Sequence, residues 1–130
     1  MTKERIYRVT VNFVVFLFVA SAIGYLLFPS AMLAVVGIAS NDQTDFLVRT
    51  LAVALVALIP GAWSARKKEN TLIFQNVVLG IAIYMFLSSL VDLHAFLTHI
   101  VNSAAIPSIV LRVIVGGVLL WFRPRQSGKL

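Results

Sequence analysis

The chain has 130 residues, of which 60% are hydrophobic and only 12% charged, with a mean hydropathy of +0.96. A soluble domain of this size could not shield so much apolar surface, because ordinary domains are about half apolar and about a quarter charged. The absence of cysteine excludes disulfides, thiolate nucleophiles and thiolate metal sites. The net charge of +6 does not indicate a nucleic-acid partner, because the basic residues lie at the ends of apolar segments and form no exposed stripe.

Four segments are long and apolar enough to cross a bilayer, which takes roughly 20 residues. Each is apolar all round, as lipid on one side and protein on the other require. The sequence therefore predicts an all-α membrane protein with a single transmembrane domain, a four-transmembrane-helix bundle. The predicted spans cover residues 8–28, 42–64, 71–95 and 104–122.

Basic residues indicate the orientation of these spans. Nine of the eleven Lys and Arg residues lie before or at the start of the first span, after the second or after the fourth, and the connections 29–44 and 95–105 contain none. The positive-inside rule makes the basic side cytoplasmic, so both termini are predicted to be cytoplasmic. The basic start followed by "ASA" at 20–22 also imitates a secretory signal, although the apolar run continues to Phe28.

The two outer connections carry signals for helix starts. Pro29 is expected to end the first span, and residues 29–39 are apolar enough for a short interfacial or re-entrant helix. Ser40, followed three residues later by Gln43, fits a capping box for the second span. Ser103 is the matching candidate cap for the fourth span.

The second and fourth spans resemble each other. "LVRTLAVALVAL" (47–58) aligns with "VLRVIVGGVLLW" (110–121), and each contains an arginine nine residues after its proposed cap, Arg49 and Arg112. Two parallel helical hairpins, related by an axis along the membrane normal, would produce this pattern.

Beyond the first turn of each predicted span, three charged residues lie within the spans: Arg49, Asp92 and Arg112. An unpaired charge inside a bilayer costs about 2.5–3.5 kcal/mol on insertion scales. Counted from the proposed caps, both arginines lie about 13 Å along their helices, and Asp92 has a similar depth if the third helix runs on to about Val101. Asp92 is therefore expected to bridge both arginines near the outer face, in a cluster with net positive charge. Three roles are open for this cluster. It holds the helices in register, it binds an anionic head group, or it pairs with an acidic group supplied by a partner subunit.

His94 and His99 follow Asp92 closely. Asp92 and His99 are seven residues apart and share a helix face if the helix continues, which makes the histidines candidates for a proton relay. Metal binding would need further ligands from other helices, so no metal site is predicted.

The runs "GYLLFPSAMLAVVGI", "FLVRTLAVALVALIPGAWSAR" and "LSSLVDLHAFLT", followed by a fourth apolar span, resemble the DoxX-like superfamily of small four-span bacterial membrane proteins. The resemblance implies a bacterial inner-membrane location and an accessory or quinone-linked role in a redox complex. Arg49 matches the arginine found early in the second span of this family.

Together these observations predict a non-catalytic membrane component that binds a lipid-like or anionic ligand, or a partner subunit, through Arg49, Asp92 and Arg112. One alternative is an intramembrane enzyme or quinone-linked redox subunit that uses Asp92 and a histidine for proton transfer. A second alternative is a small oligomeric transporter or channel. No cofactor is evident from the residues, and quinone or lipid is the expected small molecule. The expected partners are membrane lipid, a partner subunit or further copies of the chain.

Overall fold

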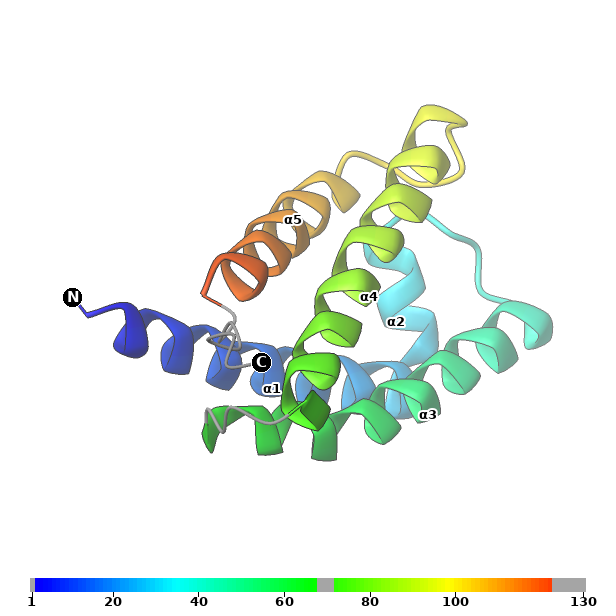
Figure 1. Ribbon diagram of the computed structural model, residues 1–130. Coiled ribbons are helices and arrows are strands. Elements are labelled where there is room, and N and C mark those ends of the chain that lie inside the picture. The colour runs from blue at the N-terminus through cyan, green and yellow to red at the C-terminus, as the bar shows by residue number, and fades with distance from the viewer. Residues whose placement is uncertain (1, 68–71, 123–130) are drawn as a thin grey trace.

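The computed structural model describes residues 2–67 and 72–122, and these residues form five α-helices and one turn of 3-10 helix (Figure 1). The elements are α1 (Lys3–Leu27), α2 (Pro29–Val35), α3 (Asp42–Ser64), η1 (Ala65–Lys67), α4 (Leu72–Leu97) and α5 (Ala105–Trp121). Helices α1, α3 and α4 are long and apolar enough to cross a membrane by length and composition. Helix α5 is apolar but shorter, at 17 residues. The all-helical class is confirmed, and the fourth crossing stays a prediction.

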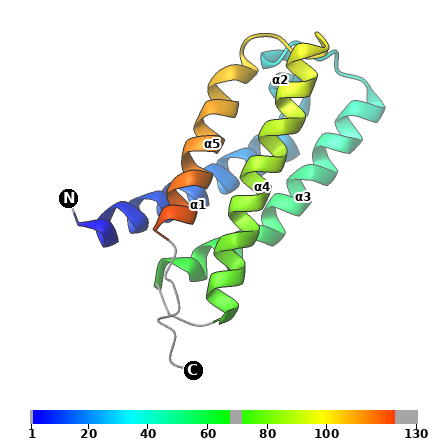
Figure 2. The same cartoon turned by 45° about the horizontal axis from the view of Figure 1, so that its top comes forward.

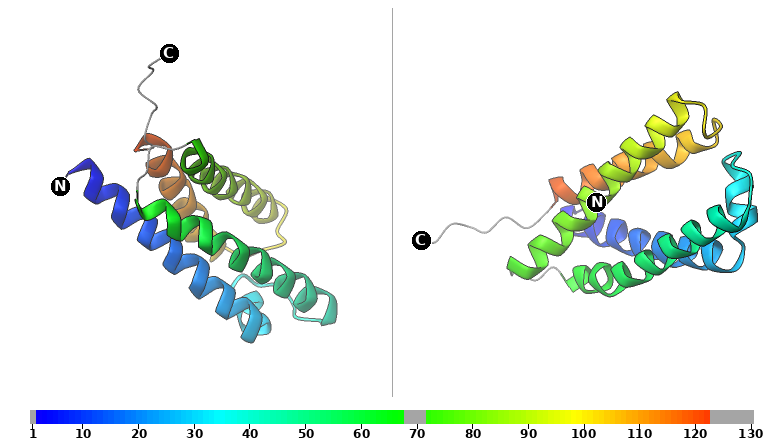
Figure 3. Two further views of the ribbon diagram at one scale, coloured as in Figure 1. Left: turned by 60° about the horizontal axis from the view of Figure 1, so that its bottom comes forward. Right: turned by 90° about the vertical axis from the view of Figure 1, so that its right-hand side faces the viewer.

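The long helices form two antiparallel pairs. Helix α1 packs mainly against α3, and α4 packs mainly against α5, whereas the two pairs meet less closely (Figures 1 and 2). In each pair the first helix runs toward the end of the molecule that holds α2, and the second runs back (Figure 3). We call this end, with α2 and the connections 36–41 and 98–104, the α2 end. Residue 2 and the final turns of α3 and α5 lie at the opposite end (Figure 3).

The core between the helices is apolar and closely packed. Helix α1 contributes residues spaced three or four apart, including Val11, Val14 and Phe18, which therefore lie on one face. The Phe18 ring meets the Tyr84 ring edge to face, with centroids 5.8 Å apart. Gly116 brings α5 close to α4, because a Cβ there would lie 3.1 Å from the Phe86 ring.

The outward faces of the helices are also apolar. Large hydrophobic side chains are exposed along α1, α3, α4 and α5, and examples are Phe16, Phe46, Leu87 and Ile114. Soluble monomers rarely expose apolar patches larger than a few hundred Å². Together with three helices of membrane-spanning length, this surface indicates a membrane protein.

Helix α3 begins at Asp42, as predicted, but its predicted cap is wrong by one residue. The N-cap is Asn41, whose Oδ1 accepts hydrogen bonds from the backbone N–H of Gln43 (3.0 Å) and of Thr44 (2.9 Å). The Thr44 hydroxyl completes the capping box by accepting from the Asn41 N–H at 2.9 Å. Ser40 instead donates its hydroxyl to the Asp45 carboxylate at 2.7 Å. Asn, Ser and Thr cap almost equally well, so the sequence "SNDQT" offered two competing registers.

The predicted cap of α5 is also wrong, because Ser103 does not cap the helix, which begins at Ala105, one residue after the predicted start. The N-cap is Ala104, and its N–H donates to Asn102 Oδ1 at 2.9 Å. Asn102 also donates its backbone N–H to Val36 O (2.9 Å) and its Nδ2 to Val35 O (3.2 Å). One asparagine therefore satisfies carbonyls at the end of α2 and a free N–H at the start of α5.

Helix α4 ends earlier than the depth estimate required. Its last residue is Leu97, and His99 follows in a left-handed conformation with φ of 59°. The Ile100 N–H donates to Ala95 O at 2.8 Å and the His99 N–H donates to Phe96 O at 3.1 Å, which is the Schellman pattern of helix termination. The helix does not continue to Val101.

Candidate functional site

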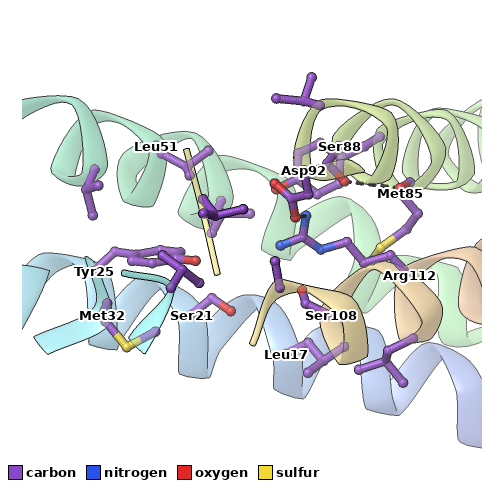
Figure 4. Close-up of a pocket in the computed structure, with 18 of the residues that line it drawn as sticks. Leu17, Ser21, Tyr25, Met32, Leu51, Met85, Ser88, Asp92, Ser108 and Arg112 are labelled. Carbon is purple, nitrogen blue, oxygen red and sulfur yellow. Dashed lines mark hydrogen bonds and ion pairs between the residues drawn. The ribbon is translucent and has the colours of Figure 1, made fainter. Parts of the chain in front are cut away.

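A cavity of about 460 Å³ lies between the two helix pairs, toward the α2 end (Figure 4). All five α-helices contribute side chains to its walls, which are mainly apolar. Met32 and Leu33 of α2 close it toward that end of the molecule. The polar side chains among its described walls are those of Ser21, Tyr25, Tyr84, Ser88, Asp92, Ser108 and Arg112.

Helix periodicity explains how the polar wall is built. Ser88 and Asp92 are four residues apart on α4, and Ser108 and Arg112 are four apart on α5. Residues with this spacing share a helix face, so each helix presents a hydroxyl one turn away from its charged group. Neither serine is among the predicted site residues, although its spacing from the charged residue is visible in the sequence.

Asp92 and Arg112 form an ion pair at the edge of the cavity. Arg112 Nη1 donates to Asp92 Oδ2 at 2.6 Å (Figure 4). The side chains are 23% exposed for Arg112 and 33% exposed for Asp92. A charge-assisted hydrogen bond of this length joins α4 to α5 directly and leaves the pair electrically neutral overall.

A buried serine supports the same contact between α4 and α5. The Ser89 hydroxyl donates to Met85 O at 2.8 Å, and it lies 3.5 Å from Ile109 O on α5. Its side chain is buried, so the hydroxyl could not be left without a partner at low cost. The helix pair that carries Asp92 and Arg112 is thus held by packing, by this hydroxyl and by the ion pair.

Arg49 lies outside the site. It is exposed on α3, does not line the cavity, and belongs to neither ion pair found among residues 2–67 and 72–122. The reason is rotational: Val48 and Leu51 face the cavity, and one residue of a helix turns the side chain by about 100°. The structure therefore brings Asp92 and Arg112 together but does not assemble the three-charge cluster with net positive charge.

The two arginines lie at the same distance from the caps of their helices, as predicted. Arg49 is eight residues after its N-cap Asn41, and Arg112 is eight residues after Ala104. Both therefore lie about 12 Å along their helices. Equal distance along the axis does not give them equal surroundings.

The two histidines are also outside the cavity. His94 is exposed in the last turn of α4, and His99 is exposed in the turn that ends this helix. Because α4 ends at Leu97, Asp92 and His99 do not share a continuous helix face. No proton relay between Asp92 and either histidine is assembled along the cavity wall in the part of the chain described.

The site offers apolar room and hydrogen-bonding groups, but no excess charge. Arginine has five N–H donors and a carboxylate has four lone-pair positions, so the pair can offer both donors and acceptors to a polar group placed beside it. The hydroxyls of Ser88 and Ser108 add uncharged partners.

Comparison of the chain with protein-family models, curated proteins and solved structures gives no match.

Proposed function

We propose that this protein is an integral membrane protein of the bacterial inner membrane that binds a lipid-like molecule without transforming it. The single observation that carries the proposal is the cavity of about 460 Å³, which has apolar walls and the Asp92–Arg112 pair at its edge. Ligand sites typically measure about 300–1,000 Å³ and combine apolar walls with a few polar groups. An amphipathic molecule matches both parts of this lining.

The membrane topology is part of the proposal. Helix α5 has 17 residues and rises about 26 Å, which is close to the hydrocarbon thickness of about 30 Å. A slightly short helix is accommodated by local thinning of the bilayer and by its flanking residues. Four crossings then put both termini on the side with the basic residues, which the positive-inside rule makes cytoplasmic.

A binding role is favoured over proton transfer by the positions of the histidines. Proton transfer through Asp92 and a histidine would need both groups at one site. Asp92 lines the cavity, whereas His94 and His99 are exposed and do not. The resemblance to the DoxX-like superfamily makes a quinone one candidate for the lipid-like molecule, and it stays a prediction.

Native mass spectrometry of the gently extracted protein tests this proposal. We expect a bound small molecule on the unmodified chain, and its loss in Ser108→Phe, which fills the cavity from α5. Val110→Phe is the matched control, because Val110 is exposed on the same helix and does not line the cavity. Circular dichroism of both variants verifies that they remain helical. If no small molecule is retained, or both variants retain it equally, the cavity is not a binding site.

A further inference from the structure

We infer that the lipid-like ligand has an uncharged, hydrogen-bonding head and that it enters the cavity sideways, through a mouth between α3 and α4. This inference rests on the proposed function and adds the chemical class of the ligand and its route. The head is assigned by the charges that line the cavity. The route is assigned by the side chains that are both exposed and part of its wall.

The charges of the cavity cancel. Among the described lining residues, Asp92 and Arg112 are the charged ones, and they bind each other at 2.6 Å. An anionic head at Arg112 would lie beside the Asp92 carboxylate, and the repulsion between like charges is strong where water is scarce. A cationic head at Asp92 would meet Arg112 in the same way. An uncharged head can accept from the guanidinium or donate to the carboxylate without separating the pair.

The absence of Arg49 from the described lining of the cavity is what favours an uncharged head over an anionic one. A second arginine beside Asp92 would give the site a net positive charge and favour a phosphate or carboxylate. Arg49 instead lies on the exposed face of α3, away from the lining. The polar groups that remain are hydroxyls, such as those of Ser21 and Ser108, which suit a hydroxyl, ester or carbonyl head.

The mouth is defined by two residues. Most of the side chains that line the cavity are buried or half-buried, and among the described ones only Leu51 (41%) and Val91 (67%) are exposed. Leu51 lies on α3 and Val91 on α4, the two helices that diverge toward the α2 end (Figures 2 and 3). Leu51 and the polar groups of α4 face each other across the cavity in Figure 4. Because the two exposed lining residues, Leu51 and Val91, are aliphatic, the rim of the opening is apolar.

The position of the rim along the helices indicates what it faces. Leu51 is ten residues beyond the Asn41 cap, and Val91 is six residues before the end of α4 at Leu97. These counts correspond to depths of about 15 Å and about 9 Å below the helix ends. In helices that cross a hydrocarbon layer of about 30 Å, both residues lie among acyl chains. The ligand thus places its head at the ion pair and leaves its chain between α3 and α4.

The first experiment tests the head. The purified full chain in phosphatidylcholine nanodiscs is titrated with monooleoylglycerol and with its phosphate ester, which share the acyl chain and glycerol. We expect the uncharged probe to bind about tenfold more tightly, because the phosphate meets the Asp92 carboxylate. Asp92→Asn leaves Arg112 with a net positive site, so the preference should reverse.

The outcomes of this titration separate the two proposals. Tighter binding of the phosphate ester by the unmodified chain would overturn the uncharged head and leave ligand binding in place. Binding of neither probe would remove the proposed function itself. If Asp92→Asn does not fold, the comparison of the two probes on the unmodified chain still decides the charge of the head.

The second experiment tests the route. Leu51→Trp and Val91→Trp are combined to narrow the mouth, and Leu47→Trp with Leu90→Trp is the control, because these two leucines are exposed on the same helices and do not line the cavity. We expect association of monooleoylglycerol to slow about tenfold in the first double variant and to stay unchanged in the second, because a blocked route lowers the rate of binding. Equal association rates in the two double variants would overturn entrance between α3 and α4.

Discussion

Replacing the arginines one at a time separates the paired guanidinium from the exposed one. Arg112→Gln removes the partner of Asp92, whereas Arg49→Gln removes an exposed arginine at the same distance from its helix cap. Both variants lose one charge from a predicted span, so the change in net charge is identical. The structure predicts very different effects on the free energy of unfolding.

The magnitude follows from the geometry of the pair. Exposed ion pairs contribute about 0–1 kcal/mol, and loss of one partner from a fully buried pair costs about 3–5 kcal/mol. With a 2.6 Å contact and exposures of 23% and 33%, Asp92–Arg112 lies between these cases. We expect Arg112→Gln to lower the free energy of unfolding by about 1–3 kcal/mol. Arg49→Gln should change it by less than about 0.5 kcal/mol.

A double-mutant cycle isolates the interaction between the two side chains. Asp92→Asn, Arg112→Gln and the double variant are unfolded in mixed micelles and followed by circular dichroism. We expect a coupling free energy of about 1–2 kcal/mol for Asp92 with Arg112, and none for Asp92 with Arg49. Equal destabilisation by Arg49→Gln and Arg112→Gln, or additive effects in the Asp92–Arg112 cycle, would refute the assignment.

Three further variants test the connections, and the same unfolding measurement checks each of them. His99→Gly should stabilise the protein by about 0.5–1 kcal/mol, because His99 ends α4 at a positive φ of 59° that glycine adopts without strain; a loss of stability would indicate a role for the imidazole. Asn102→Ala should cost about 1–2 kcal/mol, because it removes side-chain hydrogen bonds to Val35 and Ala104, and an unchanged midpoint would contradict this. Tyr7→Phe should lower the free energy of unfolding by about 1–2 kcal/mol, because the buried Tyr7 hydroxyl donates to Ala65 O at 3.0 Å. An unchanged free energy of unfolding would show that this contact with η1 does not stabilise the protein.

The helices were predictable because each signal is local. Apolar runs bounded by charged or polar residues indicate helices of membrane-spanning length, and α1, α3 and α4 have this character. A short helix was also correctly predicted within residues 29–39, where α2 covers Pro29–Val35. The capping residues were less predictable, since neighbouring residues such as Ser40 and Asn41 compete for the same role. The predicted end of the third span, residue 95, is two residues before the end of α4 at Leu97. The extension to Val101 used in the depth estimate is wrong, because His99 takes a left-handed conformation although it is not a glycine.

The ion pair was predictable only in part. Matching opposite charges at similar depth predicted that Asp92 bridges both arginines, and in the structure it pairs with Arg112 but not with Arg49. Which arginine is paired depends on the rotation of each helix about its axis, and a count along the axis carries no information about that rotation. Predicting the rotation of α3 would have required knowing which of its faces lines the cavity. That face carries Val48, Leu51 and Leu55, which follow one another at helical spacing.

The cavity itself depends on tertiary structure that no local signal contains. It exists because α1–α3 and α4–α5 pack as separate pairs and because α2 closes the space between them at one end. Small side chains such as Ala105 and Ser108 on its wall leave room that larger ones would fill. The same residues would be equally compatible with a filled four-helix core, so composition alone does not distinguish a binding protein from a scaffold.

The different surroundings of the two arginines bear directly on the nature of the proposed ligand. If both had reached Asp92, the site would carry a net positive charge, and an anionic lipid would be the natural occupant. With Arg49 on the outer face of α3, its long side chain can extend toward phosphates at the membrane surface, as arginines in membrane helices commonly do. The interior then keeps a balanced pair. Under the proposed function, an unbalanced pair would select its ligand by charge, whereas a balanced pair would select it by hydrogen bonding and by the fit of an apolar chain between α3 and α4.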